Sequence, residues 1–134
     1  MTYVIDSSVA LKWFYDEENR DKALLIYDDL ARNTASVIVP QLIIYEIGNT
    51  IRYKKPFSER KTKEAGKILE ELNLTFDNPS FQEWKAIVEL SYKLDISFYD
   101  CSYVYLAQKL NTQFVTADRK LFEKTKKLGF VKLL

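Results

Sequence analysis

The sequence predicts an α/β fold with a central, mainly parallel sheet. Short apolar segments rich in β-branched residues alternate along the chain with longer segments whose apolar residues recur at helical spacing. Helices between successive strands join parallel neighbours by right-handed crossovers and cover both faces of the sheet. No glycine- or serine-rich linker, repeat or low-complexity segment interrupts the 134 residues, so we expect residues 1–134 to form a single domain.

The first half of the chain contains two expected strands and three expected helices. Residues 3–5 form a short apolar run that suits a buried strand, and a helix can start within residues 9–15. Apolar residues recur at helical spacing over 19–32, which predicts a second helix. Residues 36–39 are mostly β-branched and precede a proline, which predicts a strand. Residues 41–53 form the third expected helix, with apolar residues on one face.

The second half continues the alternation. Pro56 ends the third helix, and Ser58 is a suitable N-cap for the next, whose apolar stripe extends to Leu72. The remaining expected elements are a weak strand at 74–76, a helix opened by Pro79, a helix over 99–110, a strand at 113–116, a helix over 119–128 closed by Gly129, and a last strand at 130–134.

Composition limits the cellular setting and the cysteine chemistry. No apolar run approaches the roughly 18 residues that cross a bilayer, and the N-terminus lacks the basic region of a signal peptide. We therefore expect a soluble, cytoplasmic protein with no membrane partner. Cys101 is the only cysteine, which excludes an intramolecular disulfide and a multi-cysteine zinc site and fits a small buried residue.

Charge is unevenly distributed, although the net charge is only +1. Basic residues crowd residues 52–67 and 119–132, and acidic residues crowd residues 16–29. Each basic cluster is either a solvated helix face or a nucleic-acid footprint, and the charges alone leave both interpretations open.

The chain contains no histidine, which excludes the usual general base, the usual zinc ligand and the serine and cysteine triads. Any catalysis must then depend on carboxylates. Four acids stand beside apolar segments that look like core: Asp6, Glu46, Asp100 and Asp118. Oxygen ligands favour Mg²⁺ or Mn²⁺ over zinc or copper, which indicates a divalent-metal site acting on phosphate.

The predicted topology brings two of these acids to one edge. Asp6 and Asp118 follow expected strands, and ligands of parallel sheets bind outside the carboxyl ends of the strands. Each acid also has a structural explanation: a cap or turn for Asp6 and Asp118, a first-turn acid for Asp100, an exposed helical residue for Glu46. Glu46 fits its explanation least, because it lies within an apolar helix where an unpaired charge is costly.

A shared cation resolves the repulsion that four neighbouring acids would create. One or two Mg²⁺ or Mn²⁺ ions bound there would activate water and stabilise charge on a phosphodiester, so that no protein base is needed. Ser8, Asn49 and Thr116 are auxiliary polar candidates that could orient a carboxylate, a water or the substrate. Ordinary capping or packing explains each of them equally well.

Four sequence blocks carry a family resemblance: YVIDSSVALKWF, PQLIIYEIGNTI, SFYDCSYVYLAQ and FVTADRKLFE. In order and spacing they resemble the motifs of the PIN-domain ribonucleases, above all the VapC-type toxins of toxin–antitoxin pairs. The resemblance spans the chain from Tyr3 to Leu133. It implies an α/β/α sandwich with a parallel sheet and endonucleolytic cleavage of RNA. It also implies a homodimer and a small inhibitory antitoxin.

The same resemblance assigns roles to individual residues. It implies that Asp6, Glu46, Asp100 and Asp118 bind Mg²⁺ or Mn²⁺, and it matches Ser8, Asn49 and Thr116 to the auxiliary polar positions of the family. Some PIN nucleases carry a further acid after the fourth one, where this chain has Arg119 and Lys120. A second metal is therefore expected to bind weakly, or only with substrate.

Three alternatives compete with the nuclease interpretation. A haloacid-dehalogenase-like phosphatase needs a second acid where the chain has Ser8, and a response-regulator receiver needs an acidic pair near the first strand that is missing. The third alternative is a catalytically silent PIN-fold module that binds RNA or protein, and failure to bind Mn²⁺ would favour it.

Two surface features complete the expectations. Residues 41–55 combine apolar and basic side chains near Glu46, which indicates a groove for an amphipathic antitoxin segment whose Arg or Lys reaches the acids. Trp13, Phe14, Tyr99 and Tyr103 are either core residues or platforms for stacking on bases, and the core interpretation is the more common one.

Overall fold

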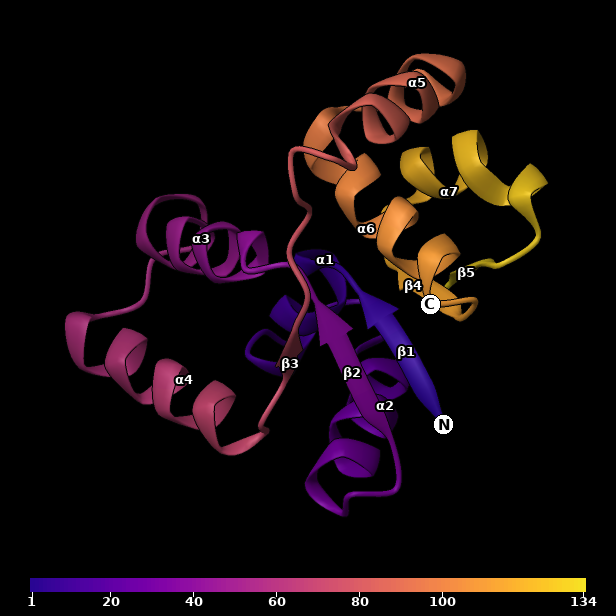
Figure 1. The fold of residues 1–134 in the computed structure, drawn as a ribbon. Helices are drawn as coiled ribbons and strands as arrows, with labels where there is room; N and C mark the ends of the chain where they lie inside the picture. Colours follow the sequence, from indigo (N-terminus) through magenta and orange to yellow (C-terminus); the bar gives the residue numbers. More distant parts are fainter.

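The computed structural model describes residues Met1–Leu134, which fold around a parallel five-stranded sheet (Figure 1). The strand order is β3-β2-β1-β4-β5 and every neighbouring pair is parallel. The prediction of an α/β fold with a mainly parallel sheet is thus confirmed. The strands are β1 (Thr2–Ile5), β2 (Ser36–Val39), β3 (Thr75–Phe76), β4 (Gln113–Thr116) and β5 (Val131–Leu133).

Seven α-helices surround the sheet. They are α1 (Ser7–Ala10), α2 (Arg20–Ala31), α3 (Leu42–Asn49), α4 (Glu59–Glu71), α5 (Trp84–Leu94), α6 (Phe98–Lys109) and α7 (Arg119–Thr125). Short 3₁₀ turns extend α1 over Leu11–Trp13 and α7 over Lys126–Leu128. None of these helices is long and apolar enough to span a membrane.

Three helix boundaries differ from the sequence prediction. The first helix begins at Ser7 rather than Val9, because the Asp6 side chain accepts a hydrogen bond from the Ser8 amide and caps it. The third helix changes at Asn49 into a π-helical segment, Thr50–Lys54. The helix expected to open at Pro79 begins at Trp84, because Ser80 and Glu83 first close a separate turn.

The core lies where the two central strands meet α6. Val4 and Ile5 of β1 and Phe114 of β4 have no exposed surface, and α6 packs against both strands. These side chains belong to one cluster of 24 buried residues. The first turn of α6, which carries Asp100, is thereby fixed relative to β1 and β4.

The register between β1 and β4 decides which polar residues meet. Ile5 of β1 is paired with Val115 of β4. The residues that follow them, Asp6 and Thr116, therefore lie side by side at the carboxyl edge of the sheet. Asp118 follows two residues later as the N-cap of α7. One edge of the sheet thus collects residues that are far apart in the sequence.

Helices α3 and α4 stand together beside the β3 edge, on the opposite side from α5, α6 and α7 (Figure 1). The connection between them is fastened to the N-terminal segment. The Tyr15 hydroxyl donates a hydrogen bond to the Lys55 carbonyl at 2.7 Å, and the Tyr15 ring packs on Phe57 at 4.9 Å between centroids. These contacts tie the connection between α3 and α4 to the N-terminal segment, while Ile43 and Ile47 of α3 pack into the core.

Four helices end at residues with left-handed backbone conformation, none of which is glycine. The residues at these ends are Asn33, Asn73, Asp95 and Asn111, with φ between 51° and 56°. Asparagine and aspartate tolerate this conformation better than other residues with a side chain. Gly129, at φ 84°, closes the turn after α7, as the sequence predicts.

Candidate active site

Asp6 is the most buried of the four predicted site acids, with 4% of its surface exposed. It lies directly after β1 and caps α1. Burial raises its pKa to about 6, hydrogen bonds from Ser8 and Thr116 oppose that rise, and the negative charge of Asp100 adds to it. A carboxylate so enclosed gains from any positive charge placed beside it.

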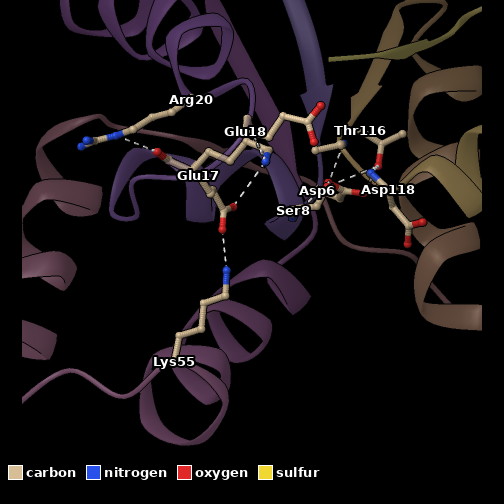
Figure 2. Close-up of polar contacts among 10 residues, drawn as sticks. Asp6, Ser8, Glu17, Glu18, Arg20, Lys55, Thr116 and Asp118 are labelled. Carbon is tan, nitrogen blue, oxygen red and sulfur yellow. Dashed lines mark hydrogen bonds and ion pairs between the residues drawn. The ribbon is translucent and has the colours of Figure 1, made fainter.

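Hydroxyl groups hold both oxygens of Asp6 (Figure 2). The Ser8 hydroxyl and amide donate to Oδ1, and the Thr116 hydroxyl donates to Oδ2 at 2.6 Å. The hydroxyl oxygens of Ser8 and Thr116 in turn accept hydrogen bonds from the Ala117 and Asp118 amides, at 2.9 and 3.1 Å. The Asp6 side chain is therefore oriented by the start of α1 and the end of β4.

Asp118 lies at the exposed rim of this network. Its Oδ1 accepts a hydrogen bond from the Leu121 amide at 3.1 Å, so that the capping role left open by the sequence is realised here. A carboxylate has further lone pairs, and Oδ2 is free of the cap.

Asp100 stands in the first turn of α6, but Ser97 caps that helix. The Ser97 hydroxyl accepts a hydrogen bond from the Asp100 amide at 3.0 Å, so the helix does not need the Asp100 carboxylate for its cap. Burial raises the pKa of Asp100, the Ser97 side chain opposes this, and the charge of Asp118 raises it further.

Glu46 reaches the same region from α3. It accepts a hydrogen bond from the hydroxyl of Tyr103, a residue of α6. Burial raises its pKa, the Tyr103 hydrogen bond opposes this, and the charge of Asp100 adds to the rise. Burial also raises the pKa of Tyr103. The hydrogen bond to Glu46 and the negative charges of Glu46, Asp6 and Asp100 raise it further, so the hydroxyl stays protonated and can donate.

Asp100 interacts electrostatically with the other three acids. Its charge raises the pKa of Asp6 and of Glu46, and the charge of Asp118 raises the pKa of Asp100. The acids nevertheless do not converge into a preformed metal site: no three of them come close enough together to hold an ion. Two of them bind helix-capping amides and Glu46 binds Tyr103. Like charges without a cation favour this separation.

No lysine or arginine forms an ion pair with any of the four acids, although the molecule contains ten such pairs elsewhere. Arg119 follows Asp118 directly but pairs with Glu18 at 3.3 Å. The structure therefore gathers negative charge at the carboxyl edge of the sheet without an ion pair to balance it, and only the charge of Lys54 acts on Glu46 from a distance.

The auxiliary candidates separate into two groups. Ser8 and Thr116 contact Asp6, in the positions expected of residues that orient a carboxylate. Asn49 is exposed at the end of α3 and makes no side-chain hydrogen bond. The roles of all three stay predictions.

Sequence reasoning missed the contribution of Tyr103, which it treated as core or as a platform for bases. Tyr103 has no exposed surface and therefore cannot stack on RNA; Trp13, also buried, donates its ring N–H to the Ala23 carbonyl. Of the aromatic candidates, Tyr99 is exposed. The available signal was spacing, since Tyr103 follows Asp100 by three residues and so shares its helix face.

The family model for the PIN domain matches residues 3–128. This chain belongs to the PIN domain family. Among curated relatives, "Exonuclease VapC9" of Pyrobaculum aerophilum is 29% identical over 104 residues, covering 75% of each protein. "Ribonuclease VapC3" of the same organism is 26% identical over 128 residues, covering 92% of this chain and 95% of the relative.

Solved structures agree on the PIN fold. PAE2754 from Pyrobaculum aerophilum superposes with a TM-score of 0.68 at 23% identity, over 98% of this chain and 83% of that one. VapBC2 from Rickettsia felis, solved bound to a DNA fragment from its promoter, gives a TM-score of 0.73 at 16% identity, over 100% and 99% of the two chains. The α/β/α architecture expected from the resemblance is confirmed.

Proposed function

We propose that this PIN domain is a metal-dependent endoribonuclease, the toxin of a toxin–antitoxin pair. The observation that carries the proposal is the set of four acids near the carboxyl edge of the sheet, three of them with raised pKa values and none in an ion pair. The relatives named ribonuclease and exonuclease support hydrolysis of a nucleic acid. The acids supply the charge that such chemistry needs.

The donor set fits Mg²⁺ or Mn²⁺. Asp6, Glu46, Asp100 and Asp118 offer only carboxylate oxygens, and the chain has no histidine to favour softer metals. These four residues would hold the ion, which when bound supplies a nucleophilic water and stabilises charge on the phosphodiester. The helix-capping and Tyr103 hydrogen bonds leave lone pairs on the carboxylates for that purpose.

The residues of the chain orient the acids and make their ionisation depend on a cation. Ser8 and Thr116 fix the plane of the Asp6 carboxylate, and α6 presents Asp100 near enough for its charge to act on both Asp6 and Glu46. Burial and mutual repulsion raise the pKa values of Asp6, Glu46 and Asp100, so these carboxyls hold their protons more tightly without a cation. A bound cation would lower these pKa values again and so release protons. Proton release on metal binding is therefore part of the proposal.

An apolar groove between α3 and α4 provides a place for the antitoxin. Its volume is about 490 Å³, and its walls include Ile43, Ile47 and Ile51 on one side and Ala65 and Leu69 on the other. Ile44, also in the lining, is 52% exposed. We propose that an amphipathic helix of a small antitoxin covers it and directs a basic side chain toward the unpaired acids.

The antitoxin proposal is tested by a change on the exposed wall of the groove. Ile44→Glu should abolish copurification of a small partner protein from the native host while thermal unfolding of the isolated chain changes little. A complex that survives both Ile44→Glu and the pair Glu46→Gln and Asp100→Asn would contradict the groove and the charge-driven contact together. A homodimer stays a prediction, which light scattering of the purified chain tests.

The decisive test of the nuclease uses end-labelled single-stranded RNA with protein freed of any inhibitor. Cleavage should occur in Mn²⁺ or Mg²⁺, stop in EDTA and be lost in Asp100→Asn. Asp28→Asn is the matched control, because Asp28 is exposed on α2 and belongs to no site. RNA cut equally by Asp100→Asn would identify a contaminant. Absence of both cleavage and Mn²⁺ binding would favour the alternative, a silent RNA- or protein-binding module.

A further inference from the structure

We propose that Tyr103 is a positioning residue, which holds Glu46 at the metal-binding acids through a hydrogen bond from α6 to α3. The inference rests on the proposed function, because it assigns Tyr103 a role in metal binding rather than in packing alone. It starts from an unusual placement. A fully buried tyrosine donates its hydroxyl proton to a glutamate on another helix, rather than to backbone.

The ring of Tyr103 is firmly fixed. It lies parallel to Phe114 of β4, with 6.0 Å between the ring centroids and 8° between the planes. It has no exposed surface, and α6 packs against both central strands. The hydroxyl therefore occupies a position set by the sheet rather than by a flexible side chain.

Glu46, in contrast, lies on α3, which has few hydrogen bonds to α6 and the central strands. The Tyr103 hydroxyl makes the only hydrogen bond between α3 and α6, and no ion pair joins these helices. Helix α3 ends in the π-helical segment Thr50–Lys54 and packs against α1, whose Ser7 side chain also hydrogen-bonds Glu46. The Ser7 contact joins Glu46 to α1, so the Tyr103 bond is the one that links Glu46 directly to α6, the helix that carries Asp100.

The geometry of the bond suits a residue that serves a metal ligand. Tyr103 donates to Oε1 of Glu46 and so restricts the carboxylate while leaving other lone pairs for a cation. Tyr103 follows Asp100 by three residues on the same helix, so one rigid element positions two of the four acids. Outer hydrogen bonds of this kind orient ligands, and their loss typically weakens metal binding 10–100-fold.

The chain offers a matched control two residues away. Tyr105 also lies on α6, and its hydroxyl hydrogen-bonds a different glutamate, Glu83, away from the predicted site. Tyr103→Phe and Tyr105→Phe delete the same atom from the same kind of pair. Only the first deletion changes a contact of a predicted metal ligand.

The experiment measures Mn²⁺ affinity by isothermal titration calorimetry, with folding checked by circular dichroism. Tyr103→Phe should raise the dissociation constant roughly tenfold, whereas Tyr105→Phe should leave it unchanged. In a Glu46→Gln background, which already binds Mn²⁺ weakly, adding Tyr103→Phe should cause no further loss. Glu46→Asp keeps the charge but withdraws the carboxylate from Tyr103, so it should weaken Mn²⁺ binding as Tyr103→Phe does. It tests the link between Tyr103 and Glu46 if Tyr103→Phe folds poorly.

The outcomes separate this inference from the proposed function. If wild type binds Mn²⁺, Glu46→Gln weakens binding and Tyr103→Phe does not, the Tyr103 bond merely satisfies a buried hydroxyl and the inference is overturned alone. If Tyr103→Phe weakens Mn²⁺ binding by the same factor in the wild-type background and in the Glu46→Gln background, its effect does not pass through Glu46. The inference then also fails. If wild type binds no Mn²⁺, both the proposed function and the inference fall.

Discussion

Two clusters around acidic residues, one at Glu17 and one at Asp6, are built in opposite ways (Figure 2). Glu17 stands between two lysines, Lys55 and Lys12, the latter at 3.4 Å. Burial raises the pKa of Glu17, but the hydrogen bond to Lys55 and the charges of both lysines outweigh it, and the net shift is downward. Asp6 is more deeply buried, has only hydroxyl and amide partners, and its pKa is raised to about 6.

The difference lies in what neutralises the charge. The Glu17 cluster carries its own cations and ties the N-terminal segment to the connection between α3 and α4, so it is complete without a ligand. The cluster of Asp6, Glu46, Asp100 and Asp118 contains no cation and repels itself. An acidic cluster without a basic partner costs stability unless something positive binds, and that cost is a signature of function rather than of folding.

Removing one acid from the unpaired cluster should have the largest effect. Asp100→Asn keeps the size of the side chain but deletes the charge that affects two neighbours. We expect Mn²⁺-dependent RNA cleavage to fall by more than about a hundredfold, the upper end of what loss of an outer hydrogen bond causes. Metal-free thermal stability should rise at the same time. Lower stability with normal cleavage would show that Asp100 serves the fold instead.

Supplying a cation should stabilise the unpaired cluster. At Mn²⁺ concentrations about a hundredfold above the dissociation constant, linkage predicts about 2.7 kcal/mol of added stability, or a rise of roughly 10 °C in melting temperature. Thermal melts of wild type in Mn²⁺ and in EDTA measure this shift. Asp28→Asn should show the full shift and Asp100→Asn little of it; equal shifts in both variants would indicate metal binding elsewhere.

The pH dependence of stability should differ in sign between the clusters. The pKa of Asp6 rises from 3.8 to about 6 on folding, so the folded state holds the proton more tightly. Metal-free stability should therefore fall by up to about 3 kcal/mol as pH increases from about 4 to 6. Urea unfolding in EDTA measures it, and Asp6→Asn should flatten the profile. An unchanged profile would mean that other groups cause it.

Glu17 contributes in the opposite direction, because its pKa is lowered and its stabilisation is lost as pH falls. Glu17→Gln should lower stability at neutral pH by about 1 kcal/mol, the scale of a partly exposed ion pair. Mn²⁺ affinity should stay unchanged, since the lysine-paired cluster has no part in metal binding. A change in affinity, read by calorimetry, would show that the two clusters are coupled.

The sequence predicted most of the fold because the strands are short, apolar and followed by strong helical patterns. It placed β1, β2 and β4 within one residue of their observed positions and anticipated that Asp6 and Asp118 share a sheet edge. Helix ends were less predictable. Whether Ser7 or Val9 begins α1 depends on the direction of the Asp6 side chain, which spacing does not specify.

The candidate acids could be chosen from the sequence, but their arrangement in space could not. Composition singled out carboxylates, and the parallel topology indicated where two of them lie. The bond from Tyr103 to Glu46 depends on how α3 and α6 are oriented in space, and no local pattern contains that information. The same holds for Asn49, whose spacing from Glu46 suggested a shared role but whose side chain is exposed.

The left-handed ends of the helices have a consequence for the unfolded chain. A glycine at such an end explores more backbone conformations when unfolded than any residue with a Cβ, and all of that freedom is lost on folding. Asn33, Asn73 and Asn111 adopt the same conformation while retaining a side chain. The protein, with only three glycines in 134 residues, thus begins folding from an ensemble that has less conformational entropy to lose.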